Sequence, residues 1–177
     1  MDVVATLKVS FDEAYAGTKK KFSVNVPGRK SKETLNLTIP AGSVSGTKLK
    51  IPGHGKPGKN GQSDGNLVIE IKVEDHPFYK VNGKNIEVNL PITFCEAVLG
   101  QKVEVPLPSG KRVLVKVPSG AKSGKRLTIK GQGMHSKNST GNLIAILDVV
   151  VPDKLNDKQK AALEKYNKIE SKEVRPW

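Results

Sequence analysis

The sequence predicts a mainly β fold: two tandem β-rich domains of similar plan, barrel-like or sandwich-like, with short helices and a separate C-terminal helix. Two observations lead to this prediction, an internal repeat and a period-two alternation of apolar residues. We expect a first β domain at residues 1–80, a second at 81–152, and a helix with a tail at 153–177.

The internal repeat is clearest in two glycine-rich segments. Residues 39–55 read IPAGSVSGTKLKIPGHG, and residues 117–133 read VPSGAKSGKRLTIKGQG. Proline, glycine, serine, leucine and isoleucine recur in the same order, and each segment leads through a polar loop into Gly-Asn-Leu at 65–67 and 141–143. Matches in this order indicate two copies of one supersecondary unit.

Apolar and polar residues alternate along several segments of the first copy. The apolar members are Ala5, Leu7 and Val9; Phe22, Val24 and Val26; Leu35, Leu37 and Ile39; and Leu67, Ile69, Ile71 and Val73. Side chains of a strand point alternately to its two faces, so this period predicts half-buried strands. The alternation does not say which apolar face is core and which is accessible.

Two short related segments, SFDEAYAG at 10–17 and TFCEAVLG at 93–100, interrupt the strand pattern. They are too short for independent helices, but each suits a helix of one or two turns that a glycine ends. Cys95 lies in the second segment, where we expect a small buried thiol.

The apolar period changes from two to about 3.6 near the C-terminus, which predicts a helix. Asn156 and Gln159 have the spacing of a capping box at its start. The narrow apolar stripe could pack on its own domain or meet its copy in a second chain. The residues that we assign to dimerisation are Leu155, Leu163, Tyr166 and Ile169.

The chain is strongly basic, with 30 Lys and Arg against 17 Asp and Glu and a net charge of +13. This balance favours anionic partners, although lysines also solubilise loops and strand edges. With a single cysteine, the chain has no internal disulfide and no cysteine-rich zinc module. Neither a membrane span nor a signal-peptide pattern is evident, so we expect a cytoplasmic protein without membrane partners.

Motifs for catalysis or cofactor binding are weak. The G-x-G-x-x-G pattern at residues 53–58 is followed by more loop and no helix, which indicates turn glycines rather than a dinucleotide site. The histidines His54, His76 and His135 are scattered and lack neighbouring ligands. We therefore expect no catalytic residues, no metal and no cofactor, and hence no enzyme.

Lysines 19–21 lie at the start of the strand predicted near Phe22. They could guard a strand edge against aggregation or bind a carboxylate-rich peptide, with Lys32 nearby if two strands pair. Aromatic residues make up only 5% of the chain, so readout of nucleic-acid bases is not expected. Attraction to the DNA backbone stays open.

Several motifs in one order resemble the C-terminal domains of DnaJ-type co-chaperones. They are VSFDEAYAGTKKKFSVNVP, the two P-x-G-x-x-x-G blocks, DGNL followed by alternating apolar residues, His76-Pro77, and LPITFCEAVLG. The resemblance covers about residues 3–165. It implies two barrel-like β domains, and a C-terminal helix that joins two chains into a horseshoe-shaped homodimer.

The resemblance also implies a function: a co-chaperone fragment that binds unfolded polypeptide and delivers it to a 70-kDa heat-shock chaperone. The implied client pocket consists of Ala5, Leu7, Phe22, Val24 and Ile69. The implied site for that chaperone's acidic tail consists of Lys20, Lys21 and Lys32. Ala5 is smaller than the usual residue, which implies a shallower pocket or a different client preference.

Two features of the wider family are not found in these residues. There is no His-Pro-Asp loop of a J domain, since His76-Pro77 continues into Phe78, and there is no cysteine-rich zinc module, which resembles the zinc-free class. The alternative function is that of a basic DNA-associated protein of the same family, which binds duplex DNA through lysine-rich surfaces.

Overall fold

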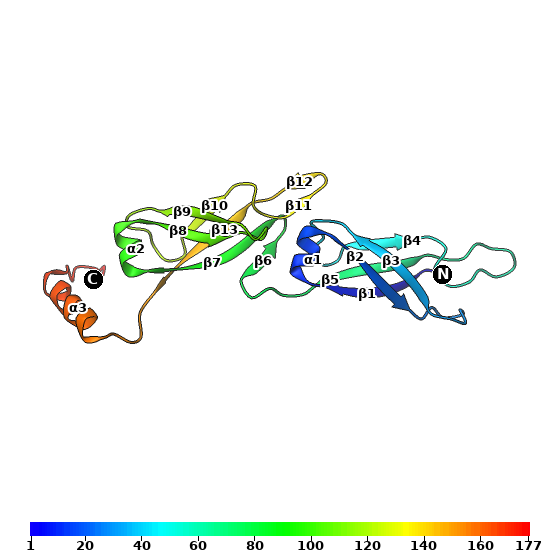
Figure 1. Ribbon diagram of the computed structural model, residues 1–177, viewed down its shortest axis with the longest axis horizontal. Coiled ribbons are helices and arrows are strands. Elements are labelled where there is room, and N and C mark those ends of the chain that lie inside the picture. The colour runs from blue at the N-terminus through cyan, green and yellow to red at the C-terminus, as the bar shows by residue number, and fades with distance from the viewer.

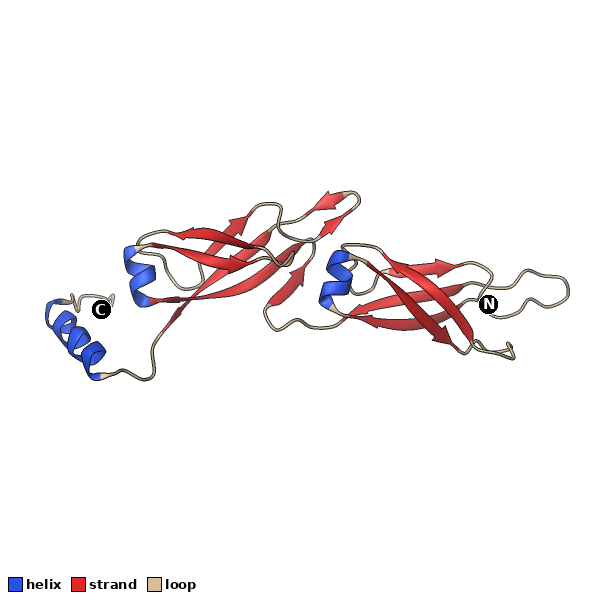
Figure 2. Cartoon of the chain, in the orientation of Figure 1, coloured by secondary structure: helices blue, strands red, loops and turns tan.

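The fold is described from a computed structural model that covers residues 1–177. The molecule is elongated, with two β units end to end and a C-terminal helix beyond the second unit (Figure 1). Strands dominate both units, and two short helices and one longer helix complete the chain (Figure 2). The mainly β fold class predicted from the sequence is therefore confirmed.

The first unit, which we call the first repeat, consists of two open sheets. Parallel pairing of β1 with β5 and antiparallel pairing of β4 with β5 give a sheet of order β1-β5-β4. A separate β2–β3 hairpin forms the second layer. The elements are β1 (Val3–Val9), α1 (Phe11–Ala16), β2 (Thr18–Val24), β3 (Glu33–Ile39), β4 (Lys48–Ile51) and β5 (Leu67–Val73).

The second repeat copies this plan and adds three strands. Its sheet has the order β10-β13-β7-β6, and β8–β9 is its hairpin layer. Neither repeat closes into a barrel, so both are sandwich-like. The elements are β6 (Tyr79–Asn82), β7 (Asn85–Thr93), α2 (Phe94–Leu99), β8 (Gln101–Pro106), β9 (Arg112–Val117), β10 (Arg126–Ile129), β11 (His135–Ser136), β12 (Ser139–Thr140) and β13 (Leu143–Val150).

Each repeat encloses its own apolar core between its two layers. The core of the first repeat contains eight buried side chains, and that of the second contains fourteen. The inward members come from alternate positions of the strands, as Leu67, Ile69 and Ile71 of β5 show with exposures of 1% or less. The period-two pattern in the sequence therefore marks the strands of the first repeat correctly.

The two short helices are fixed by matching caps. Ser10 and Thr93 each form a capping box with the glutamate three residues later, and Gly17 and Gly100 end the helices with positive φ of 77° and 80°. The prediction for these helices is confirmed. Cys95, however, is exposed, so the prediction of a buried thiol is wrong. A six-residue helix buries one narrow face, and in α2 Ala97 occupies that face.

The C-terminal helix α3 (Asp157–Ile169) begins as predicted, with a capping box between Asn156 and Gln159. None of its side chains is buried, and its one aromatic contact joins Tyr166 to Phe94 of α2 at 6.1 Å between ring centroids. No helix of the structure combines the length and apolar composition that crossing a bilayer requires.

The two repeats meet through packed side chains as well as through the chain. Phe11 of α1 and Tyr79 of β6 stack at 5.5 Å, and both belong to the core cluster of the second repeat. The β11–β12 hairpin lies against the first repeat, where a Cβ on Gly42 would clash with the carbonyl oxygen of His135. The two repeats are therefore in direct contact at the junction.

Candidate functional site

The first repeat has two unpaired strand edges on one side of its sandwich. β1 pairs only with β5, and β2 pairs only with β3. At the end next to α1, the Lys20 ammonium of β2 donates to the backbone carbonyl of Lys8 in β1 at 3.4 Å, so the two edges adjoin there. We call the inward side chains along these edges the seam: Val3, Ala5, Leu7, Phe22 and Val24.

The structure brings the five residues of the predicted client pocket into one cluster. Ile69 and Leu7 belong to the buried core, with exposures of 0% and 8%. Ala5, Phe22 and Val24 are half-buried and pack against that core. Leu7 and Ile69 are therefore core residues, and Ala5, Phe22 and Val24 pack on this core as partly accessible apolar side chains. Its role in binding remains a prediction.

The three lysines of the predicted acidic-tail site do not share one face. Along β2, Lys20 points inward with Phe22 and Val24, whereas Lys19 and Lys21 are exposed on the outer face. Lys32 lies one residue before Glu33, which pairs with Val24, and it is exposed. Lys20 is already bound to Glu13 at 3.2 Å, so its surroundings differ from those of Lys21 and Lys32.

One arginine side chain connects the loops at the end of the first repeat that lies away from α1. Arg29, in the β2–β3 turn, donates to the carbonyl oxygens of Gly53 and Gly55 at 2.8 and 2.9 Å. It also forms ion pairs of 3.1 Å with Glu33 and Asp64. Arg29 thus connects the G-x-G-x-x-G segment to the β2–β3 hairpin by hydrogen bonds. The segment is a turn, and the next element after it is strand β5 and not a helix.

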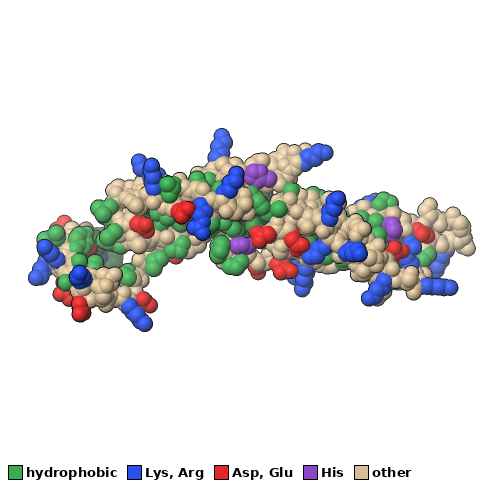
Figure 3. Space-filling model, viewed as in Figure 1, with side chains coloured by type: hydrophobic (Ala, Val, Ile, Leu, Met, Phe, Trp, Pro, Cys, Tyr) green, Lys and Arg blue, Asp and Glu red, His purple; other side chains and the backbone are tan.

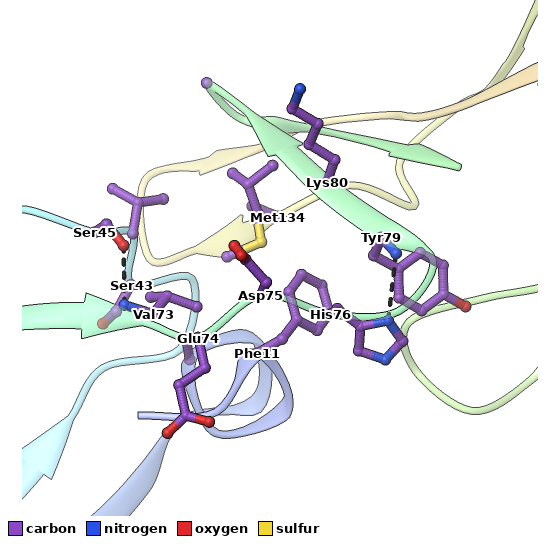
Figure 4. Close-up of a pocket in the computed structure, with 14 residues that line it drawn as sticks. Phe11, Ser43, Ser45, Val73, Glu74, Asp75, His76, Tyr79, Lys80 and Met134 are labelled. Atoms are coloured by element: carbon purple, nitrogen blue, oxygen red, sulfur yellow. Dashed lines mark hydrogen bonds between the residues drawn. The ribbon is translucent and has the colours of Figure 1, made fainter. Parts of the chain in front are cut away.

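A cavity of about 720 Å³ lies between the repeats and away from the seam (Figure 4). His76 lines this cavity, and its Nδ1 atom accepts hydrogen bonds from the backbone N–H groups of Phe78 and Tyr79. Burial raises the pKa of the Tyr79 phenol. The lining includes Phe11, Val44, Val73, His76, Tyr79 and Met134.

The reasoning from sequence did not identify this cavity. The run His76-Pro77-Phe78-Tyr79, which joins the two copies of the repeat, was its only signal. Figure 3 shows several acidic side chains close together near the middle of the molecule, whereas lysines and arginines are spread over both repeats. No group of three or more His, Cys, Asp or Glu side chains is arranged to hold a metal ion.

A second apolar surface lies at the far end of the molecule. The four residues assigned to dimerisation are all exposed: Leu155 at 41%, Leu163 at 43%, Tyr166 at 40% and Ile169 at 82%. Phe94, Val98 and Leu99 of α2 are exposed as well, and Phe94 touches Tyr166. The structure of one chain leaves this surface uncovered, so dimerisation stays a prediction.

Comparison with known proteins decides the family. The family model described as DnaJ C terminal domain matches residues 3–152, which include both repeats. The chain belongs to the DnaJ C terminal domain family. The resemblance inferred from the sequence motifs is therefore confirmed.

The curated relatives of this DnaJ C terminal domain chain include proteins named "Curved DNA-binding protein" from Salmonella paratyphi B, Salmonella newport and Salmonella heidelberg. Each is 36% identical over an alignment of 168 positions, and the alignment covers 90% of this chain and 55% of the relative. The chain thus spans about half the length of the curated relatives that it matches.

Proposed function

We propose that this chain is the client-binding part of a co-chaperone, and that the seam of the first repeat holds extended, unfolded polypeptide for a 70-kDa heat-shock chaperone. The observation that carries this proposal is a pair of unpaired strand edges flanked by half-buried Ala5, Phe22 and Val24. Membership of the DnaJ C terminal domain family supports it. The function requires binding and release, and no covalent step.

The expected free energy of client binding to the seam is small enough for the client to be released. A strand edge offers backbone N–H and C=O groups to any sequence, while the seam takes alternate side chains. Burial of one apolar client side chain contributes about 1.5–3 kcal/mol. Ordering the client offsets a comparable amount, so one site should bind at about micromolar strength or weaker.

The remaining parts of the chain fit this role. We propose that residues 1–80 bind the client, that 81–152 form a second β domain, and that 153–177 join two chains. Two seams in one dimer raise avidity for a single unfolded chain by roughly 10²–10⁴ where the spacing permits. We further propose that Lys20, Lys21 and Lys32 attract the acidic tail of the partner chaperone.

A matched pair of substitutions tests the proposal. Phe22→Ser removes an apolar side chain from the seam, whereas Val4→Ser removes one from the outer face of β1, where Val4 is 64% exposed. We expect Phe22→Ser to lose most of the suppression of aggregation of a denatured enzyme, and Val4→Ser to retain it. Equal activity of both variants, with unchanged circular dichroism, contradicts the client-binding role of the seam.

Binding of duplex DNA is the second candidate function. It is favoured by the name of the Salmonella relatives and by the net charge of +13. Phosphate contacts through lysines would make the affinity fall steeply with salt. Titration of labelled duplex DNA at two salt concentrations separates the functions: tight, salt-dependent binding of DNA without binding of apolar peptides favours this candidate.

A further inference from the structure

The cavity of about 720 Å³ between the repeats is lined by side chains from both of them. Phe11 and Val44 come from the first repeat, and Val81 and Met134 come from the second. Cavities of this size, with apolar side chains and a few polar groups in their lining, are typical of sites for small organic molecules. No residue of the seam or of α3 lines this cavity, so it is separate from both surfaces.

The apolar part of the cavity surface is fixed in position before any ligand binds. Phe11, Tyr79 and Met134 are only 4%, 7% and 4% exposed, and the rings of Phe11 and Tyr79 stack at 5.5 Å. The hydrogen bonds that His76 Nδ1 accepts from Phe78 and Tyr79 hold the segment between the repeats. Ring carbons and a thioether sulfur are favourable partners for an aromatic group of a ligand.

One carboxylate lies at this cavity without a cationic partner. Asp75 forms no ion pair, and in Figure 4 its carboxylate points toward the other labelled residues, whereas that of Glu74 points away from them. A further negative charge is near, because burial and, after it, the charge of Asp12 raise the pKa of Tyr79. The charge at the cavity is therefore suited to a cationic ligand.

The one lysine of the lining does not neutralise Asp75. Lys80 lies opposite Glu87 in the pairing of β6 with β7. Hydrogen bonds from Arg126 and Asn82, and then the positive charge of Lys80, lower the pKa of Glu87. The positive charge of Lys80 thus acts on Glu87, and in Figure 4 its ammonium group points away from the other labelled residues.

We infer that the cavity binds a small organic cation with an aromatic group, of the class of the arylalkylamines. The ammonium group lies at Asp75, where it gains a charge-assisted hydrogen bond, and the ring packs against Phe11 and Met134. Because both repeats line the cavity, the ligand contacts both and stabilises their arrangement in Figure 1. This inference is independent of the client-binding role proposed for the seam.

Three ligands with the same ring and different charge test the inference: phenylpropylamine, phenylpropanol and phenylpropionate. Ligands of this size bind at about millimolar strength, which NMR titration of the isotope-labelled chain measures. The amine should bind about fivefold more tightly than the alcohol at low salt, as expected for a partly exposed ion pair. Phenylpropionate should bind more weakly than the alcohol, because Asp75 repels it. Backbone shifts should change at residues 43–45 and 73–83 and not along the seam.

Two variants locate the ligand. Asp75→Asn should reduce the affinity for the amine to that for the alcohol and leave the alcohol unchanged. The matched control is Asp153→Asn, which alters an exposed aspartate that does not line the cavity. Val44→Trp enlarges a partly exposed side chain of the lining, so it should abolish saturable binding of both the amine and the alcohol.

The outcomes that overturn the inference are distinct. Equal affinities of the amine and the alcohol, or an unchanged affinity for the amine in Asp75→Asn, exclude the cationic class of ligand. Undiminished binding in Val44→Trp, or shifts confined to the seam or to α3, places the ligand outside the cavity. The absence of any saturable shift with the amine removes the site altogether. If the inference is correct, the amine also raises the melting temperature of the wild type more than it raises that of Asp75→Asn.

Discussion

The ammonium group of Lys20 lies 3.2 Å from the carboxylate of Glu13 and 3.4 Å from the carbonyl oxygen of Lys8. Its charge is thus balanced within the first repeat, where it closes the end of the seam next to α1. Lys21 and Lys32 have no such ion pair. An anionic ligand would have to compete with Glu13 for Lys20 but not for the other two.

The acidic-tail hypothesis therefore predicts an order among the three lysines. Lys21→Ala and Lys32→Ala should each weaken binding of an acidic peptide roughly two- to fivefold, as expected for exposed ion pairs. Lys20→Ala should have the smaller effect, because its charge is already paired. Fluorescence anisotropy at two salt concentrations measures this, with Lys137→Ala in the β11–β12 turn as the control. The largest loss in Lys20→Ala would contradict the prediction.

Glu13 also predicts a dependence of stability on pH. The backbone N–H of Ser10 donates to its carboxylate and, with Lys20, lowers its pKa below the ordinary value of 4.5. A carboxylate whose folded pKa is lowered stabilises the fold above the unfolded pKa, and this contribution is lost as the pH falls through the folded pKa. The advantage of the wild type over Glu13→Gln should be present at about pH 6 and vanish near about pH 2.

Calorimetric melting temperatures of the two proteins across this range check the prediction. Subtracting the variant's curve removes the similar effects of Asp2, Asp64 and Glu87, whose pKa values are also lowered. A difference in melting temperature that grows as the pH falls below 4.5 would have the wrong sign and would refute the assignment to Glu13.

Much of the fold could be predicted because local signals and the repeat agree. Alternating residues around Leu37 and Ile69 mark strands, and Asn156 marks the start of the last helix. The two copies of the glycine-rich block imply two similar sandwiches, which the structure contains. These features depend on residues close in sequence or on a duplication visible in the sequence itself.

The features that escaped prediction depend on contacts between distant residues. Period two cannot distinguish buried Ile69 from half-buried Phe22, because exposure depends on whether another strand covers the edge. Nothing in the local sequence places Tyr79 against β7, or Cys95 on the outer side of α2. The predicted acidic-tail site grouped Lys20 with Lys21, whereas the structure places them on opposite faces of β2, and the ion pair of Lys20 with Glu13 was not predicted.

Arg29 should be important for the stability of the first repeat. Arg29→Ala removes the hydrogen bonds to the carbonyl oxygens of Gly53 and Gly55 and two ion pairs, and charged hydrogen bonds of this kind contribute about 1.5–3 kcal/mol. We expect faster amide hydrogen exchange in β2, β3 and the turn at Gly53, with the second repeat unchanged. Lys30→Ala, an adjacent exposed lysine, is the control.

The apolar side chains of α3 predict a dimer that one charged residue disrupts. Leu163, Tyr166 and Ile169 expose apolar surface that a single chain does not cover, and a charge buried in an apolar contact without a partner is strongly destabilising. We expect light scattering to give roughly twice 19.1 kDa for the wild type and 19.1 kDa for Leu163→Glu. Lys165→Glu changes the charge more but lies off the apolar stripe, so it should remain dimeric. A wild-type mass of 19.1 kDa at every protein concentration measured would contradict dimerisation through α3.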